Sequence, residues 1–221
     1  MRRPRGTRRI LAVGAAAALT VLLAQNTTSA SFTATTVDNG NQVTAAASFC
    51  TSTGSAVLSP AADTATYQSN PNANYGSTVS IGVGSATSAN AYSYMKFTLP
   101  VLPTDCTVTS ATLSIHASTP TSGATLSVYR ADAAWNATTL TWNTVGRPGF
   151  TGTPATTASL ASAGFQSWNV TTLTQQLYTG PDYGFALKDS VDNAASARYQ
   201  TWDSVEATTV GNRPTLSLAW G

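Results

Sequence analysis

The chain has 221 residues, of which 42% are hydrophobic and only 9% are charged. Its formal net charge is +2, but five of the eleven basic residues lie within residues 1–9. Residues 31–221 therefore contain six basic and nine acidic residues, which gives a net charge of −3. Because nucleic-acid binding needs a basic face, this balance excludes nucleic acid as a partner.

The first thirty residues have the organisation of a signal peptide. Residues 1–9 carry five arginines and no acid, and residues 10–23 form an uncharged, mostly apolar run. Thr28-Ser29-Ala30 fits the small-x-small rule, so we expect cleavage after Ala30 and a secreted or cell-surface protein. The apolar run is shorter than the roughly twenty residues of a membrane-spanning helix, so no span is expected after cleavage. An uncleaved anchor is the alternative, and the export route stays open.

Residues 31–54 form a small, polar stretch that differs in composition from the rest of the chain. The order Ser-Phe-Thr-Ala-Thr-Thr-Val-Asp-Asn-Gly-Asn at 31–41 resembles the region after the cleavage site in substrates of SipW-type signal peptidases, the TasA/camelysin group. In that group the new N-terminus can pair as a β-strand, sometimes with a neighbouring subunit. The resemblance therefore implies self-association through this segment, and an extended linker is the alternative interpretation.

Two cysteines, Cys50 and Cys106, remain after the signal peptide. In an oxidising compartment such a pair is expected to form a disulfide. The bond would close a loop of 56 residues and stabilise the fold by about 3–4 kcal/mol. Metal or thiol chemistry is the alternative, but the chain has one histidine and no paired ligand spacing.

From residue 55 onward, short segments alternate between apolar and polar residues, and clusters rich in Asn, Gly and Pro separate them. This pattern predicts an all-β domain over 55–221, a β-sandwich or jelly roll of about ten short antiparallel strands. One helical turn is expected at 172–178, ended by Gly180. The alternating segments are Thr64–Gln68, Val79–Val83, Tyr92–Phe97, Val108–Ile115, Leu126–Tyr129, Leu140–Trp142, Phe165–Val170, Gly184–Leu187, Arg198–Trp202 and Thr215–Trp220.

A series of motifs between residues 62 and 218 has a characteristic order and spacing. In chain order they are Asn74-Tyr75-Gly76, Ile81–Val83, Tyr94–Phe97, Val108–Ile115, Leu126–Tyr129, Trp135, Thr138–Asn143, Arg147-Pro148, Trp168–Thr171, Tyr183–Lys188 and Arg213–Leu218. Together they resemble the DNRLRE-domain family, which is related to a family of carbohydrate-binding modules. The resemblance implies a jelly roll from secreted and surface proteins, some of which bind acidic polysaccharides such as alginate. The chain departs from the family at Asn169, where an aspartate is usual, and it has few basic residues for a polyuronate.

Large flat side chains are the candidates for contact with a sugar, since aromatic rings pack against the C–H faces of pyranoses. Tyr75 lies in a loop rich in Asn, Gly and Pro, where a surface contact is easier to arrange than a core position. Trp135 and Trp142 are candidates too, with core or loop-anchoring roles as the alternative. The full set of predicted ligand-binding residues is Tyr75, Trp135, Trp142, Trp202, Lys96 and Arg147.

Asp63, Asn72 and Asn74 lie close together in a loop-rich region. Their oxygens are of the kind that binds Ca²⁺, so they are candidate calcium ligands. The spacing of an EF-hand is absent, and capping of Asx turns explains these residues equally well. Apart from this calcium site, we expect no cofactor.

The chain shows no motif for catalysis. His116 is not accompanied by a nucleophile motif, and the nine acids form no recognisable pair of the kind that hydrolyses glycosidic bonds. We therefore expect a non-catalytic extracellular module that binds a polysaccharide or a cell-surface glycan. The alternatives are a structural or adhesive surface protein that assembles through its N-terminal strand, and a small hydrolase.

Overall fold

The computed structural model describes residues 37–38, 41–42 and 49–221. The chain divides into two units, Met1–Ala46 and Ala47–Gly221. In the first unit β1 (Val37–Asp38) pairs antiparallel with β2 (Asn41–Gln42). The predicted signal peptide over 1–30, and most of the predicted segment over 31–54, lie outside the described residues. All that follows concerns the second unit.

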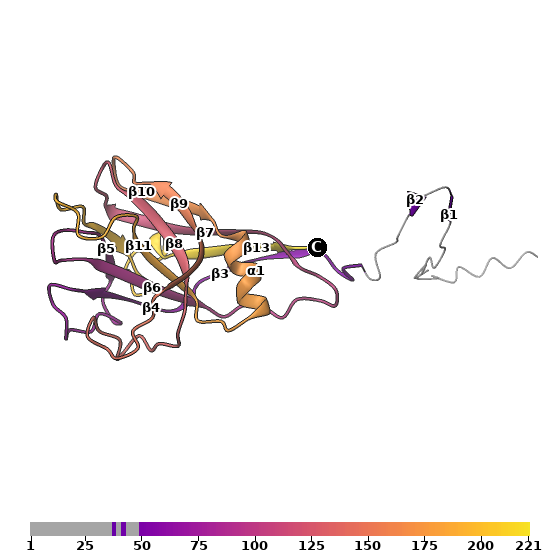
Figure 1. Cartoon of the computed structure of the whole chain (residues 1–221), viewed down its shortest axis with the longest axis horizontal. Coiled ribbons are helices and arrows are strands. Elements are labelled where there is room, and N and C mark those ends of the chain that lie inside the picture. Colours follow the sequence, from indigo (N-terminus) through magenta and orange to yellow (C-terminus); the bar gives the residue numbers. More distant parts are fainter. Residues whose placement is uncertain (1–36, 39–40, 43–48) are drawn as a thin grey trace, which may run out of the picture. The chain divides into compact units, whose positions relative to one another are not determined.

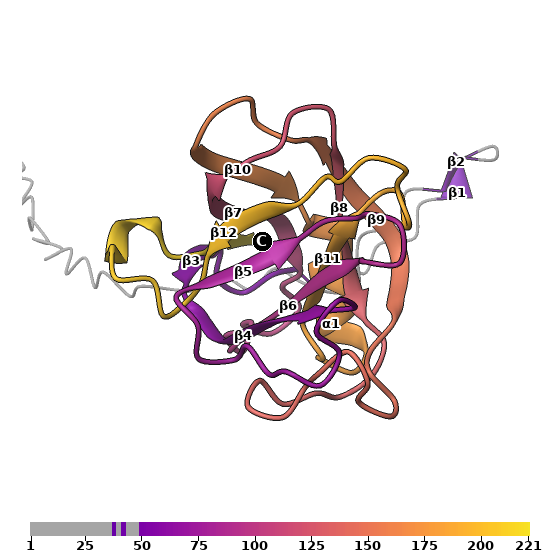
Figure 2. The ribbon, with the colours of Figure 1, turned by 90° about the vertical axis from the view of Figure 1, so that its left-hand side faces the viewer.

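Eleven strands of the second unit form two antiparallel sheets that pack face to face, as Figures 1 and 2 show. The predicted all-β sandwich is therefore confirmed. One sheet contains β3 (Gly54–Leu58), β13 (Thr215–Trp220), β7 (Val108–Thr119), β12 (Gln200–Asp203) and β5 (Ser80–Val83) in that order, with β10 (Gly164–Asn169) on the other edge of β7. The other has the order β4 (Pro60–Tyr67), β6 (Ala91–Phe97), β11 (Phe185–Asp189), β8 (Thr125–Ala131) and β9 (Phe150–Ala158).

Alternation along the strands places the core between the sheets. In β7, Leu113 and Ile115 are buried, whereas Thr112 on the opposite face is exposed. Each fully buried aliphatic side chain of this kind stabilises the fold by roughly 1.5–3 kcal/mol. At the centre of the core Trp168 and Trp202 are in contact, with their rings 5.6 Å apart.

The helix α1 (Thr171–Thr179) confirms the helical turn expected at 172–178. The Asn169 side chain stabilises the turn that leads into this helix, because its Oδ1 accepts hydrogen bonds from the Thr171 N–H (3.1 Å) and hydroxyl (2.7 Å). An amide oxygen thus accepts both bonds where the DNRLRE resemblance leads one to expect a carboxylate. Leu173 and Leu177 project from the helix into the core.

Three segments differ from the prediction. The strand β3 was not among the expected strands, the first of which began at Thr64. Residues 140–142, expected as a strand, form turns, because Leu140 packs under a loop instead of pairing with a neighbour. The strand β9 was not expected, since Gly152 and Pro154 interrupt its alternation and it lies at the edge of its sheet. A register shift in its pairing with β8 accommodates this irregular sequence.

The disulfide Cys50–Cys106 is present, as expected. It lies at the narrow end of the module, where the chain enters the sandwich (Figure 1). Close to it the Thr51 N–H donates to the carbonyl oxygen of Thr104 (3.2 Å), and two backbone hydrogen bonds join Thr107 to Gly221. The disulfide therefore fastens the start of the module to the segment before β7, which is in turn hydrogen-bonded to the C-terminal residue.

Replacing both cysteines by serine should lower the free energy of unfolding by about 3–4 kcal/mol, because the 56-residue loop is then no longer closed in the unfolded chain. Urea unfolding followed by tryptophan fluorescence measures this change. Reducing agent should lower the stability of the wild-type protein to that of the variant and leave the variant unchanged. Equal stability of the two proteins without reductant would contradict the prediction.

In the part of the chain that the structure describes, no helix is long and apolar enough to cross a membrane.

Candidate functional site

The candidate site lies on the outer face of the five-stranded sheet, the face that does not contact the other sheet. Alternate residues of β6 point to this side, and they are Tyr92, Tyr94 and Lys96. The loop between β8 and β9, residues 132–149, covers part of the face. Beneath this loop Tyr94 and Leu140 are almost completely buried in a second hydrophobic cluster.

Trp135 anchors this loop to the sheet. It is 8% exposed, and its indole N–H donates to the carbonyl oxygen of Tyr183 at 2.8 Å. The Lys96 ammonium donates to the carbonyl oxygen of Trp135 at 2.6 Å and lies 4.5 Å from the centre of its ring. Burial lowers the pKa of Lys96. Of the two interpretations of Trp135, the structure supports loop anchoring. Lys96 helps to hold the same loop through its contacts with Trp135.

A second loop, residues 68–79, is joined to the first loop by hydrogen bonds. The Asn74 side-chain amide donates to the carbonyl oxygens of Ala137 (2.6 Å) and Leu140 (2.8 Å). The amide of Asn143 donates to the Asn72 side-chain oxygen at 2.9 Å. At Gly76 a Cβ atom would lie 2.0 Å from the carbonyl oxygen of Ala137, so this close approach requires glycine. Asn72 and Asn74, predicted as calcium ligands, thus join two loops.

Next to the anchored loop lies a set of aromatic and basic side chains, which we call the aromatic–cationic cluster. Its members are Tyr92, Tyr129, Trp142, Arg147, Phe150 and Lys188. The ring of Tyr92 lies 5.0 Å from that of Trp142 and 4.9 Å from that of Phe150, which in turn lies 5.4 Å from Tyr129. All of these members except Tyr92 are partly exposed, so the rings form a continuous platform that solvent reaches.

The two basic residues of the cluster lie over the rings. The Arg147 guanidinium is 4.2 Å from the centre of Trp142, and it donates to the Tyr94 hydroxyl at 3.0 Å and the Trp142 carbonyl oxygen at 3.1 Å. The Lys188 ammonium is 5.2 Å from the centre of the Phe150 ring. These cation–π contacts and hydrogen bonds hold both charges at the platform.

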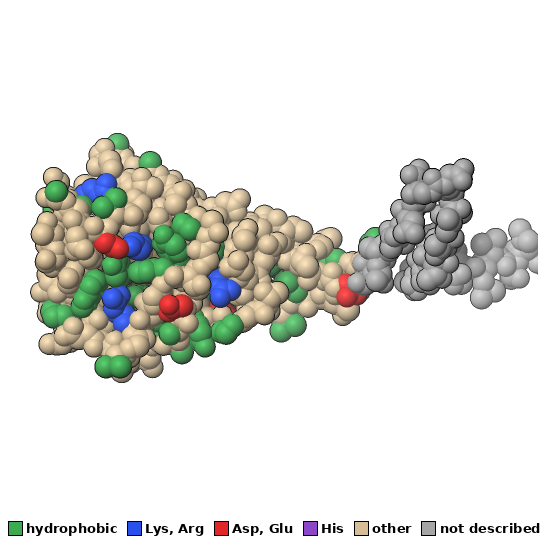
Figure 3. Space-filling model, in the orientation of Figure 1, with side chains coloured by type: hydrophobic (Ala, Val, Ile, Leu, Met, Phe, Trp, Pro, Cys, Tyr) green, Lys and Arg blue, Asp and Glu red, His purple; other side chains and the backbone are tan. Residues whose placement is uncertain are grey.

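One carboxylate balances the charge at this platform. Asp192 forms an ion pair with Lys188 and accepts a hydrogen bond from the Tyr92 hydroxyl at 3.0 Å. Burial, followed by the charge of Asp192, raises the pKa of Tyr92, so this hydroxyl stays a donor across the physiological range. Figure 3 shows how these charged and hydrophobic groups lie on the surface, where blue and red side chains alternate with green hydrophobic ones over β6, β8 and β11.

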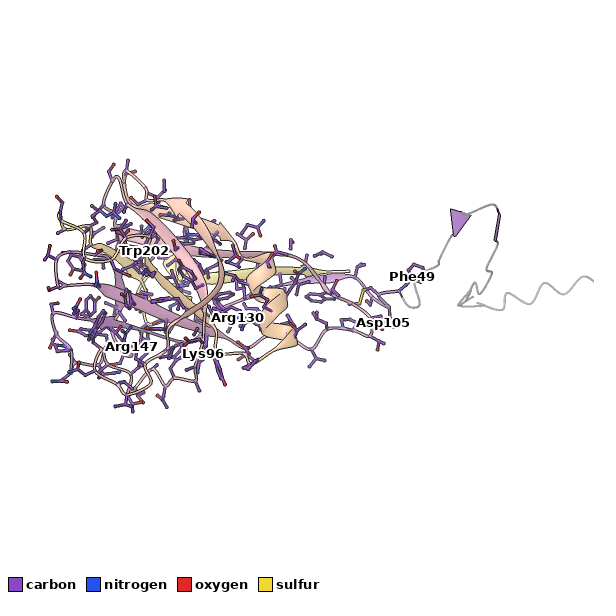
Figure 4. All side chains as sticks on the ribbon, viewed as in Figure 1. Phe49, Lys96, Asp105, Arg130, Arg147 and Trp202 are labelled. Atoms are coloured by element: carbon purple, nitrogen blue, oxygen red, sulfur yellow. A yellow bond between two sulfur atoms is a disulfide. The ribbon has the colours of Figure 1, made fainter. Side chains whose placement is uncertain are left out.

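Of the predicted ligand residues, the structure brings Trp142 and Arg147 together in the cluster. Figure 4 shows Arg147 and Lys96 on the same part of the molecule, whereas Phe49 and Asp105 lie at the opposite, narrow end. Tyr75 is half-buried and contacts Tyr67 edge-on, with ring centres 4.6 Å apart. Tyr75 therefore packs between its loop and the core.

The prediction of a ligand-binding role for Trp202 is wrong. Its side chain is 0% exposed and packs on Trp168 in the middle of the core, where no polysaccharide can reach it. The alternation in 198–202 correctly indicated a strand, but it did not show which face of that strand is buried. Trp202 is on the inner face of β12.

Four members of the cluster were not predicted as ligand residues: Tyr92, Tyr129, Phe150 and Lys188. Burial gave no clear signal for Tyr92 or Tyr129, because Tyr92 lies in a strand that is buried on both faces and Tyr129 is followed by the partly exposed Arg130. Phe150 begins the unexpected strand β9, and Lys188 follows the apolar run 185–187. Only the pairing of β11 with both β6 and β8 brings these residues together.

A groove of about 760 Å³ lies elsewhere, between the loop 99–103 and the C-terminal half of α1. Its lining is mostly aliphatic and includes Leu99, Val101 and Leu102. The hydroxyl of Tyr178, its aromatic residue, already donates to the carbonyl oxygen of Pro100 at 2.8 Å. The groove therefore offers less to a sugar than the aromatic–cationic cluster.

His116 has a partner that the sequence did not indicate. On the outer face of the six-stranded sheet its Nδ1 lies 2.7 Å from the Asp203 carboxylate, and its ring contacts Phe165 edge-on. A base oriented by a carboxylate still needs a nucleophile or a bound substrate to act on. In the described hydrogen bonds His116 is joined to Asp203 alone.

Comparison with known families decides the class of the module. The model of carbohydrate-binding module family 96 matches residues 54–219, from the first strand of the sandwich to the last. The chain belongs to carbohydrate-binding module family 96. A search of curated proteins finds no match.

The family 96 assignment agrees with the carbohydrate-binding part of the predicted resemblance. It does not test the DNRLRE relationship or the TasA-like segment, which stay predictions. Every member of the aromatic–cationic cluster lies inside the matched residues. The partner of a family 96 module is a carbohydrate.

Proposed function

We propose that the protein is an exported, non-catalytic module that binds a polysaccharide or a cell-wall glycan on the outer face of its five-stranded sheet. The observation that carries the proposal is the aromatic–cationic cluster, in which the partly exposed rings of Trp142 and Phe150 each lie about 5 Å from the buried ring of Tyr92, with Arg147 and Lys188 over them. This combination suits a chain of sugar rings, since aromatic faces contact C–H groups and cations donate to hydroxyl or carboxylate oxygens.

The rigidity of the platform favours binding. Trp142 and Arg147 belong to a loop that Trp135, Lys96 and Asn74 fasten to the sheet and to the neighbouring loop. A surface that is already ordered loses little conformational entropy when a ligand arrives, so more of the contact energy appears as affinity.

The carboxylates around the platform support a non-catalytic role. Asp192 is engaged by Lys188 and the Tyr92 hydroxyl, and Asp132 accepts a hydrogen bond from the Gly149 N–H at 2.6 Å. Glycoside hydrolysis requires one carboxyl group to give a proton and a second to act as base or nucleophile. Here both carboxylates hold the site together instead.

Trp142→Ala should weaken retention on polysaccharide about tenfold or more, because it removes a partly exposed indole ring of the platform and the surface on which Arg147 packs. Pull-down with insoluble polysaccharides and cell-wall material, followed by affinity electrophoresis with the glycan that is retained, measures the effect. Phe165→Ala is the matched control, since it removes a 49%-exposed ring from the opposite sheet.

The control variant should bind as the wild-type protein does. If Trp142→Ala is retained equally well, the binding surface lies elsewhere. If no glycan retains the wild-type protein, the proposed function itself fails.

A further inference from the structure

A pair of acidic side chains lies where β4 and β5, an edge strand of each sheet, run next to each other (Figure 2). Asp63 of β4, one of the predicted calcium ligands, is 1% exposed, so its carboxyl group lies within the protein. Its Oδ2 accepts a hydrogen bond from the Val205 N–H at 2.7 Å. Val205 and the second acid, Glu206, belong to the connection 204–214 between β12 and β13.

The two acids have complementary free oxygens. Asp63 Oδ1 and Glu206 Oε2 are both buried, and neither accepts a hydrogen bond from a donor group of the protein. A buried carboxylate oxygen without a donor is costly. A side-chain hydrogen bond links the two carboxyl groups when one of them carries a proton. One shared proton therefore satisfies both oxygens at once.

No basic side chain neutralises this pair. Among the described residues, Glu206 brings the only charge that acts on Asp63. Met95 is the residue opposite Asp63 on the neighbouring strand β6, whose other titratable side chains point to the outer face. The remaining charged residues of the adjoining segments have other partners, and they are Asp203, which contacts His116, and Arg213, which donates to the carbonyl oxygen of Ala207 at 3.0 Å.

The environment of Asp63 favours its protonated form. Burial, which outweighs the opposing effect of the Val205 N–H, raises the pKa of Asp63 to about 7, and the charge and the hydrogen bond of Glu206 act in the same direction. If the connection 204–214 opens and water reaches Asp63, its pKa returns toward the ordinary value of 3.8. Between these values the closed form binds one proton more than the open form, so opening becomes easier as the pH rises.

The pair is a polar link between this connection and the five-stranded sheet. The start of the connection is held by Ser204, whose N–H donates to the carbonyl oxygen of Val79 at 3.2 Å and whose hydroxyl donates to that of Thr78 at 2.6 Å. Both of these contacts are to the segment that leads into β5. The contacts with Asp63 instead join the connection to β4, which belongs to the other layer of the sandwich.

We propose that Asp63 and Glu206 share one proton in the folded protein and that loss of this proton to solvent releases the connection 204–214 from β4. The connection then stays closed in mildly acidic surroundings and opens more readily at neutral pH. The pair acts as a pH-sensitive contact between the two sheets, whether or not a glycan is bound.

Hydrogen exchange of the amides in 204–214, measured by mass spectrometry and corrected for the intrinsic pH dependence of exchange, tests the proposal. For amides that exchange through local opening, protection should fall by up to about tenfold for each pH unit between pH 4 and pH 7 and then level off. At pH 7 the connection should exchange faster than the central strand β7, whose peptides report opening of the whole fold.

Three variants separate the shared proton from a merely structural contact. Asp63→Asn should keep the connection protected at every pH, because the new amide donates permanently to Glu206 while its oxygen still accepts from the Val205 N–H. Asp63→Ala should remove the protection at pH 5 as well as at pH 7, since both contacts are lost. Glu206→Gln should give a smaller pH response than the wild-type protein, because the charge and the proton of Glu206 no longer act on Asp63.

Asp105→Asn is the matched control, since it makes the same change at an exposed loop residue and should keep the full pH response. Wild-type protection of 204–214 that stays constant between pH 5 and pH 7 would overturn the proposal. A pH response of wild-type size in Asp63→Asn or in Glu206→Gln would do the same. These measurements use no carbohydrate, so their outcome is separate from that of the proposed glycan binding.

Discussion

Replacing Trp202 by alanine is expected to lower the free energy of unfolding by about 3–5 kcal/mol. The side chain is fully buried against Trp168, so its removal leaves a large cavity in the centre of the core. Urea unfolding of the purified variant measures the loss. Glycan retention per folded molecule should stay at the wild-type level, because the ring is not part of the outer face.

Trp142→Ala is the matched comparison for Trp202→Ala. Trp142 is only partly buried and lies at the surface over Arg147, so its removal should cost much less stability while it weakens binding. Comparison of the two variants therefore distinguishes the effect of a tryptophan on stability from its effect on glycan binding. Loss of glycan binding in a Trp202→Ala protein that is still folded would contradict the assignment of the outer face.

The contribution of Asp63 to the stability of the protein should fall as the pH rises from about 4 to about 7. Asp63 loses its proton near its ordinary pKa of 3.8 in the unfolded chain, but holds it up to a pKa of about 7 in the folded protein. Between these values the folded state binds more protons, so each added pH unit reduces the free energy of unfolding by up to about 1.4 kcal/mol. Because the side chain is 1% exposed, solvent screens little of this effect, and the total is on the order of 4 kcal/mol.

Denaturant unfolding at a series of pH values, for the wild-type protein and Asp63→Asn, checks this dependence. The other carboxyl groups titrate in both proteins, so the difference between the two curves isolates Asp63. That difference should grow from pH 4 to pH 7 in favour of the variant and then level off. Parallel curves over this range would show that Asp63 is ionised in the folded protein.

The fold could be predicted from the sequence to a large extent, because alternation records which side of a strand is buried. Strands such as β7 and β10 carry that pattern clearly, and the cysteine pair followed from their number and the expected compartment. The edge strand β9 lacks the pattern, since none of its residues is fully buried and it therefore has no continuous apolar side.

The candidate site could be predicted only in part. Trp142 and Arg147 belong to one short motif, so local sequence was enough to propose them together. Lys188 and Tyr92 meet them through the pairing of strands that are far apart in the chain. The hydrogen bond from the Val205 N–H to Asp63 could not be predicted for the same reason, because 142 residues separate two groups that only the fold brings together.

The disulfide also determines how the module responds to a pulling force. A tension applied along the chain before Cys50 reaches Cys106, at the start of the central strand β7, before it reaches the edge strand β3. Without the bond, β3 would peel from β13 one residue at a time, beginning at the pair Gly54 and Trp220. With the disulfide, the force passes through the covalent bond to Cys106 and does not act on the pairing of β3 with β13. The module is thus built to stay folded when the chain before Cys50 is pulled.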